Sequence, residues 1–144
     1  MQKIFKHSIS ALFTFFVLVV LSSNISKAQS NEYKRFIGKW ITGPNHENYM
    51  KIGDNYIRVY LYVEDVDGML YSRMESPDAD VFNMPGEETT SSGDKIKIYF
   101  KQLDAIYRGE INRGNTQITG ALAFLGKTVP LGFVKVMVEP NMLK

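Results

Sequence analysis

Four residues that alternate along one short segment are the strongest candidates for binding chemistry. Tyr56, Arg58, Tyr60 and Tyr62 occupy every second position, so in a β-strand they share one face. Aromatic rings on such a face can stack on a planar or sugar-like ligand, and Arg58 can meet an anionic group. Together with Trp40 they form our candidate ligand-binding set. The competing interpretation, which we favour, is an outward strand face with ordinary cross-strand pairs.

Residues for nucleophilic or metal chemistry are scarce. A Ser–His–acid triad needs a histidine, and beyond the first 28 residues the sequence holds only His46, in a polar segment. The absence of cysteine excludes disulfides, a lipobox cysteine and thiolate metal sites. One histidine cannot supply a His/Cys metal site. We therefore expect no catalytic residue, no metal, no cofactor and no enzymatic activity.

Acidic residues leave one catalytic possibility open, a carboxylate-based hydrolase. Nothing in the sequence marks two acids as a glycosidase pair, because their separation depends on the fold. The available carboxylates are Glu75, Asp78, Glu87, Glu88 and Glu110. Asp65 and Asp67 before Gly68 could suggest calcium, but Val63 stands where an EF-hand loop needs its first acid. A hairpin turn explains this segment fully.

Short alternating runs separated by turn residues must position these side chains. In 56–63 the aliphatic residues occupy one face, and 95–101 repeats the pattern. Weaker runs cover 36–42, 49–52, 69–76, 105–111, 118–124 and 129–138. Turns rich in Gly, Asn and Asp recur at the spacing of an antiparallel barrel or sandwich. We predict an all-β fold, a small antiparallel β-barrel of about eight strands, with 77–92 mostly a long loop containing one irregular strand near 87–90.

The predicted interior follows from the apolar faces of these runs. Its residues are Trp40, Ile57, Val59, Leu61, Leu70, Met74, Ile96, Ile98, Phe100, Tyr107, Ile111, Ile118, Leu122, Leu131 and Phe133. The interior of so small a barrel is either filled by side chains or holds one small ligand.

The first 28 residues are typical of a cleavable signal peptide. Two lysines precede a short apolar run, and Ser26-Lys27-Ala28 places small residues three and one before the cut. Cleavage lowers Lys+Arg from 17 to 14 against 15 acidic residues, so the charge changes from +2 to about −1. A near-neutral domain has no charge-based reason to bind nucleic acid. We expect a leader over 29–35, the barrel over 36–138 and a tail over 139–144, in a periplasmic or secreted bacterial protein with no membrane span after cleavage.

Several short motifs occur in a familiar order. The segment Phe36-Ile37-Gly38-Lys39-Trp40 resembles the Gly-x-Trp opening of lipocalin-type barrels, where the Trp plugs one end. Farther along stand GMLYSRMESPD at 68–78, YRGEI at 107–111, ITG at 118–120 and VPLGFVK at 129–135. This order resembles the small lipocalin-like β-domain that precedes α/β-hydrolase or serine-peptidase domains in secreted bacterial proteins. Ala79 and Asp80 depart from it, because Gln often follows Ser-Pro-Asp there.

The resemblance implies an accessory domain standing without its hydrolase, and no catalytic residue is carried over from it. We expect an exported, non-catalytic binding module that takes a small apolar or amphipathic molecule in the barrel. The alternative is a protein-interaction or inhibitor module whose partner is a separately encoded exported hydrolase. An open apolar cavity would favour the first, and a packed core with an exposed aromatic patch would favour the second.

Overall fold

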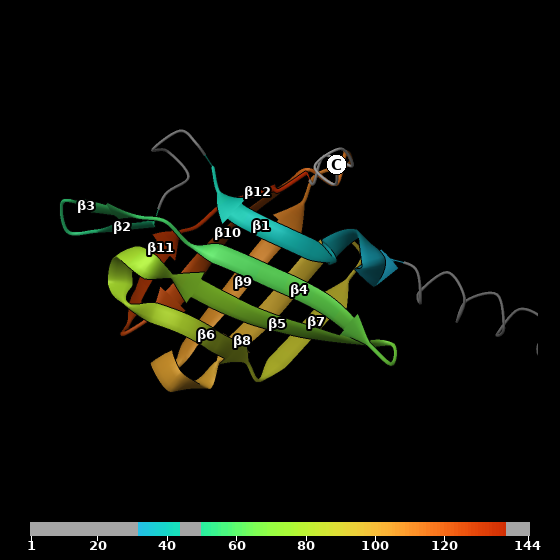
Figure 1. Cartoon of the computed structure of the whole chain (residues 1–144), viewed down its shortest axis with the longest axis horizontal. Helices are drawn as coiled ribbons and strands as arrows, with labels where there is room; N and C mark the ends of the chain where they lie inside the picture. Colours follow the sequence, from blue (N-terminus) through green and yellow to red (C-terminus); the bar gives the residue numbers. More distant parts are fainter. Residues whose placement is uncertain (1–31, 44–49, 138–144) are drawn as a thin grey trace, which may run out of the picture. The chain divides into compact units, whose positions relative to one another are not determined.

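The computed structural model describes residues 32–43 and 50–137, nearly all of them in the compact unit Tyr33–Lys144. They fold as an all-β, nearly closed antiparallel barrel (Figure 1). The predicted fold class is confirmed, although the main sheet has ten strands where about eight were expected. The predicted signal peptide (1–28), His46 and the tail (139–144) lie outside the described residues.

Twelve strands and three 3-10 turns form in the described part of the chain. In order they are η1 (Tyr33–Phe36), β1 (Gly38–Thr42), β2 (Met50–Ile52), β3 (Asn55–Ile57), β4 (Tyr60–Val66), β5 (Met69–Ser76), η3 (Pro77–Ala79), β6 (Val81–Gly86), β7 (Glu88–Ser92), β8 (Lys95–Phe100), η4 (Lys101–Leu103), β9 (Ala105–Ile111), β10 (Gln117–Phe124), β11 (Lys127–Pro130) and β12 (Phe133–Lys135). Asp67 and Gly68 both have positive φ, the geometry of a tight two-residue hairpin turn between β4 and β5.

The main sheet runs in the order β6-β5-β4-β1-β12-β10-β9-β8-β7, with β11 also paired to β10. Its edges, β6 and β7, are consecutive in the chain and meet at a corner at Gly86. There the Ser72 and Thr89 hydroxyls lie 2.7 Å apart and join β5 to β7. The hairpin β2–β3 forms a separate two-stranded sheet at one end of the barrel, and η1 lies at the other end (Figure 1).

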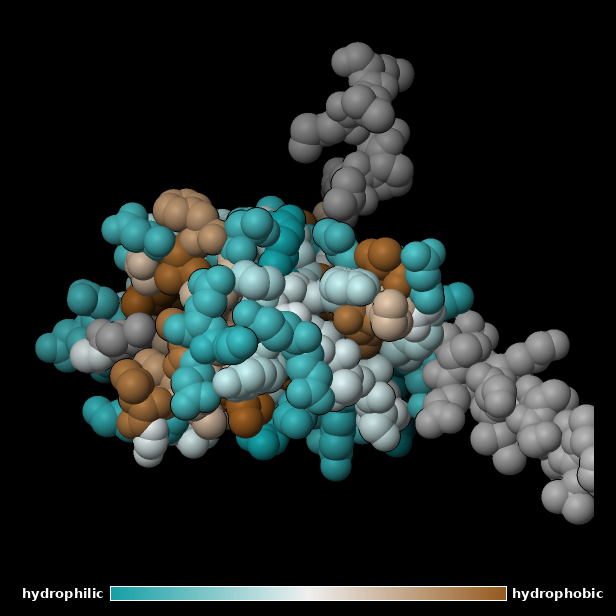
Figure 2. Space-filling model, turned by 90° about the horizontal axis from the view of Figure 1, so that it is seen from below, coloured by the Kyte–Doolittle hydropathy of each residue, from teal (hydrophilic) through white to brown (hydrophobic). Residues whose placement is uncertain are grey.

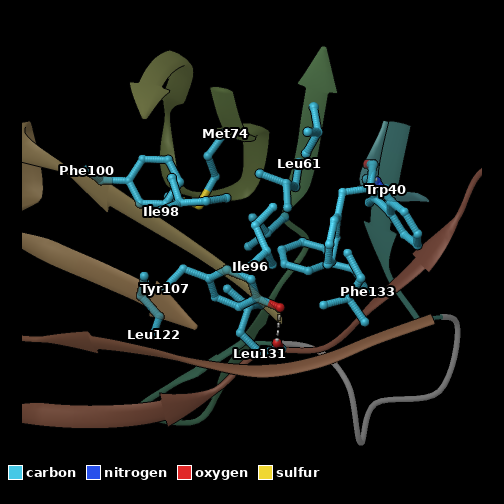
Figure 3. Close-up of a cluster of buried hydrophobic side chains, with 14 of the residues drawn as sticks. Trp40, Leu61, Met74, Ile96, Ile98, Phe100, Tyr107, Leu122, Leu131 and Phe133 are labelled. Atoms are coloured by element: carbon cyan, nitrogen blue, oxygen red, sulfur yellow. Dashed lines mark hydrogen bonds between the residues drawn. The ribbon is translucent and has the colours of Figure 1, made fainter. Parts of the chain in front are cut away.

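Large side chains fill the barrel interior (Figure 3). The buried hydrophobic residues are Phe36, Trp40, Met50, Val59, Leu61, Val63, Met74, Met84, Ile96, Ile98, Phe100, Ala105, Tyr107, Ile111, Ile118, Leu122, Leu131 and Phe133. Every residue predicted to face inward is therefore buried except Ile57 and Leu70, which are half-buried against this core. No buried side-chain nitrogen or oxygen among the described residues lacks a hydrogen-bond partner.

The predicted continuous strand over 56–63 is wrong, because the chain breaks between β3 and β4. The Arg58 N–H donates to Asp78 Oδ2 (2.9 Å), and the Val59 N–H donates to Thr42 Oγ1 (3.2 Å). Side chains distant in sequence thus satisfy two backbone donors that a regular strand would pair across a ladder. The inward alternation still holds on β4, where Leu61 and Val63 are buried.

The predicted long loop over 77–92 is wrong over 77–86, where η3 and β6 form, whereas the irregular strand predicted near 87–90 corresponds to β7. Pro85 is tolerated because β6 is an edge strand, where a missing N–H costs no ladder bond. Gly86 marks close packing, since a Cβ there would lie 2.3 Å from Ser72 Oγ and 2.5 Å from Ile98 Cγ2. The expected single run over 129–138 is interrupted between β11 and β12, because β12 moves on to pair with β1.

Candidate functional site

Tyr60 and Tyr62 lie half-buried on the outer face of β4, covered by cations from neighbouring strands. Lys39 Nζ lies 4.9 Å from the Tyr60 ring centre and 5.3 Å from that of Tyr62. The Arg73 guanidinium carbon lies 3.6 Å from the Tyr62 ring centre. The Tyr62 hydroxyl donates to Glu75 Oε2 (3.1 Å), and Arg73 pairs with the same carboxylate. Cross-strand contacts within the chain therefore occupy much of the surface that a stacked ligand would need.

Arg58 and Val59 form the joint between β3 and β4, and Arg58 is hydrogen-bonded to Asp78. Its backbone N–H, Nε and Nη2 all donate to the Asp78 carboxylate, at 2.9, 3.2 and 3.1 Å. The hydrogen bonds from the Arg58 side chain and backbone hold the pKa of Asp78 below its usual value. This pair ties η3 to the β3–β4 joint at the end of the barrel that carries the β2–β3 hairpin.

Trp40 is buried in the barrel interior (Figure 3), on the face of the sheet opposite the outer face that carries Tyr60 and Tyr62. Its Nε1 donates to the Phe36 carbonyl (2.7 Å), and Lys135 Nζ lies 5.0 Å from its ring centre. Burial lowers the pKa of Lys135. Tyr56 is about half exposed on the β2–β3 hairpin. The structure thus distributes the five candidate residues over the hairpin end, the outer face of β4 and the interior, and does not gather them into one pocket.

An apolar cavity of about 140 Å³ opens at the hairpin end of the barrel. Its lining residues are Met50, Ile57, Val59, Met74, Ser76, Ala79, Val81, Leu103, Leu122 and Phe124. The polar group among them, the Ser76 hydroxyl, donates to the Arg58 carbonyl (2.8 Å). The cavity therefore offers a hydrophobic surface with its hydroxyl already satisfied. Figure 2 shows hydrophobic residues gathered toward this end of the molecule.

Sequence reasoning missed this cavity because most of its wall comes from the ends of elements. Ala79 belongs to η3, Leu103 to η4 and Phe124 to the last position of β10, where no strand alternation continues. A weak signal was available, since Val81 and Leu103 are apolar residues that follow polar turn segments. Only the fold shows that they face one another.

The carboxylates considered for hydrolysis mostly serve structural contacts. Glu75 pairs with Arg73, Asp78 pairs with Arg58, and Glu87 Oε2 accepts the Lys101 N–H (2.8 Å). Within residues 32–43 and 50–137, no group of three or more His, Cys, Asp or Glu side chains is arranged to hold a metal ion. The same residues include no helix long and apolar enough to cross a membrane.

Comparison with known proteins leaves the family open. No protein-family model matches the chain, and no curated protein sequence matches it. Among solved structures, the chain is similar to secretory abundant heat soluble protein 4 from Ramazzottius varieornatus. The identity is 14% and the TM-score 0.43, over 72% of this chain and 96% of the other. The resemblance to the hydrolase-associated lipocalin-like domain remains a prediction from the motifs.

Proposed function

We propose that this chain is an exported, non-catalytic binding module that holds a small apolar group in the mouth of its barrel. The observation that carries the proposal is the apolar cavity bounded by the β2–β3 hairpin, η3 and η4. The rest of the interior is filled by side chains such as Tyr107 and Phe133, so the mouth is where a ligand can enter. The signal-like segment 1–28 supports export, and the scarcity of catalytic residue types supports a binding role.

The size of the cavity limits the ligand. A dry apolar cavity of about 150 Å³ accommodates a benzene-sized molecule, whereas drug-sized ligands need roughly 300 Å³ or more. A cavity of about 140 Å³ therefore suits one ring or a short alkyl chain. Any polar part of the ligand would remain at the rim, beside the Arg58–Asp78 pair. An amphipathic molecule with a short apolar end fits both features.

A protein partner is the second candidate. Phe82 and Leu125 are 67% and 83% exposed, and each follows a cavity-lining residue, Val81 or Phe124. Exposed large hydrophobic residues mark an interaction site when they form a contiguous patch. In this alternative, the apolar group in the mouth is a side chain of the partner.

The test is a titration of the protein with n-alkanoates of four to ten carbons. Amide chemical shifts and calorimetry measure the binding of each alkanoate. We expect affinity to rise about threefold to fourfold per methylene and then level off once the cavity is full. Ala79→Phe, which fills the mouth, should abolish binding. The matched control Ala123→Phe lies on β10 outside the lining and should bind as the parent does.

The proposal fails if no alkanoate shifts the amides of lining residues such as Leu122 and Leu103. It also fails if Ala79→Phe and Ala123→Phe weaken binding equally. Copurification of a stoichiometric protein that Ala79→Phe displaces, without alkanoate binding, would establish the second candidate instead.

A further inference from the structure

A shallow, open groove of about 550 Å³ lies on the outer face of the sheet between β7 and β10. It shares no lining residue with the apolar cavity at the barrel mouth. Three basic side chains line it, Lys95 and Lys97 from β8 and Arg108 from β9, together with Glu110 from β9. Their side chains are exposed to solvent.

Strand register places these charges in two rows across the sheet. In one row Lys95 is the direct partner of Glu110, so opposite charges face each other. In the other row Lys97 is the direct partner of Arg108, so two cations stand about 5 Å apart at their Cβ atoms. Neither Lys97 nor Arg108 forms a side-chain hydrogen bond or ion pair with another residue of the described part. Like charges directly opposite one another destabilise a sheet, and an anion between them relieves that cost.

Hydroxyl groups complete the lining. On β7, Thr90 is the cross-strand partner of Lys97 and Ser92 is the partner of Lys95. On β10, Thr119 is the cross-strand partner of Glu110. All three are exposed and line the groove. Hydroxyls can donate to an anion and can also accept from a sugar hydroxyl.

We infer that this groove binds the anionic groups of an acidic oligosaccharide. Lys97 and Arg108 pair with a carboxylate or sulfate group, and Thr90, Ser92 and Thr119 bind neighbouring sugar hydroxyls. The lining contains no aromatic ring on which a nucleobase could stack, which disfavours single-stranded nucleic acid. Its apolar side chain, Ile96, is 2% exposed and offers no pocket to the side chains of a peptide.

The test is titration of the purified protein with a hexamer of galacturonate, with neutral maltohexaose as the uncharged probe. We expect hexauronate to shift the amides of Thr90, Lys97 and Arg108, and to bind more weakly as ionic strength rises. Replacing both cations, Lys97→Gln with Arg108→Gln, should weaken binding about tenfold. The control pair Lys34→Gln with Lys127→Gln removes the same charge from exposed sites outside the groove, and should change affinity by less than about twofold.

Equal binding of maltohexaose would overturn the inference, since charge would then play no part. So would equal losses in the two double variants, or an absence of hexauronate binding at low salt with both proteins folded by circular dichroism. Tighter binding of a single-stranded oligonucleotide than of hexauronate at the same salt would assign the groove to nucleic acid instead. The alkanoate series above is independent of these outcomes, because the two sites share no residue.

Discussion

Tyr107 places a phenol in a largely apolar interior, and two glycines make room for it. The hydroxyl donates to the Leu131 carbonyl (3.2 Å), and the ring meets Phe133 edge-on at 5.5 Å (Figure 3). Gly109 and Gly120 are cross-strand partners beside it. A Cβ at Gly109 would lie 2.7 Å from the Tyr107 hydroxyl oxygen, and one at Gly120 would lie 2.5 Å from it.

Gly120→Ala should therefore destabilise the barrel. The new methyl would also lie 2.4 Å from the Arg108 carbonyl oxygen, a backbone atom that cannot swing aside. We expect the free energy of unfolding to fall by about 2 kcal/mol or more in urea denaturation. Gly114→Ala is the matched control, because its nearest neighbour lies at 3.6 Å, and it should cost less than about 0.5 kcal/mol. Equal effects at both positions would contradict this packing account.

Tyr107 should also make the protein sensitive to alkaline pH. Burial raises the pKa of this phenol above its usual value of 10.0. In the unfolded chain the phenol ionises from about pH 10, while in the native state it stays neutral to higher pH. The stabilisation that the buried neutral phenol adds to the free energy of unfolding is thus complete below pH 10, and it is lost as the pH rises beyond 10. The expected decline in the free energy of unfolding is up to about 1 kcal/mol per pH unit.

Tyr107→Phe should reduce that alkaline decline, measured by urea denaturation between pH 9 and about pH 11. Tyr33 and Tyr99 donate to Asp65 and Asp104, which raises their pKa values as well, so a smaller decline should persist. Tyr71→Phe on the exposed part of β5 serves as the control and should keep the parental slope. An unchanged slope in Tyr107→Phe would rule out the buried phenol as the cause.

At the scale of elements, the joint between β3 and β4 depends on a side chain that replaces a ladder hydrogen bond. Thr42, at the end of β1, is 1% exposed, and its Oγ1 accepts the Val59 N–H while its own N–H donates to the Val59 carbonyl (3.0 Å). The joint turns the chain from the hairpin into β4 and places Ile57 and Val59 in the cavity wall.

Thr42→Val tests this joint. The substitution keeps the shape of the side chain but leaves the buried Val59 N–H without its acceptor, which should cost about 1–3 kcal/mol of unfolding free energy. Thr42→Ser keeps the hydroxyl and loses one methyl group, so it should cost about 1 kcal/mol. Thermal and urea denaturation of both variants measure the two losses in unfolding free energy. If the valine variant is the more stable of the two, the hydroxyl is not what holds the joint.

At the scale of the whole molecule, one barrel presents two chemically different surfaces. The hairpin end has an apolar mouth, and the outer face of β7–β10 has a basic, hydroxyl-lined groove. Side chains fill the interior between these two surfaces, and neither surface needs a central cavity to bind its ligand. A near-neutral domain with one local basic groove would bind anions there and not over its whole surface.

Processing at the N-terminus is the prediction that belongs to this scale. We expect cleavage after Ala28, so that intact-mass spectrometry of the protein recovered from the periplasm or medium finds Gln29 as the first residue. Ala28→Asp should block cleavage and leave the precursor in the cell, because a charged residue replaces the small one that the peptidase reads. A mature protein that still carries Met1 would refute the signal-peptide interpretation.

The sequence by itself determined the strands whose alternation is local. The predicted runs 69–76 and 105–111 coincide with β5 and β9, and the inward residues of β4, β8 and β9 follow from period two. Each of these elements is framed by its own turn residues, such as Asp67 and Gly68 before β5. Nearest neighbours in the chain were enough to place them.

The tertiary structure alone decided the rest, because it depends on residues far apart in the chain. The break between β3 and β4 needs Asp78, which lies 20 positions from Arg58, and Thr42, which lies 17 positions from Val59. The segment 77–92 forms strands because β5 and β8 offer open ladders to β6 and β7, which outweighs its Pro and Gly content. The candidate tyrosine face became a set of cross-strand contacts in the same way. Alternation is a local property, whereas a partner for a backbone group or a ring is supplied by the fold.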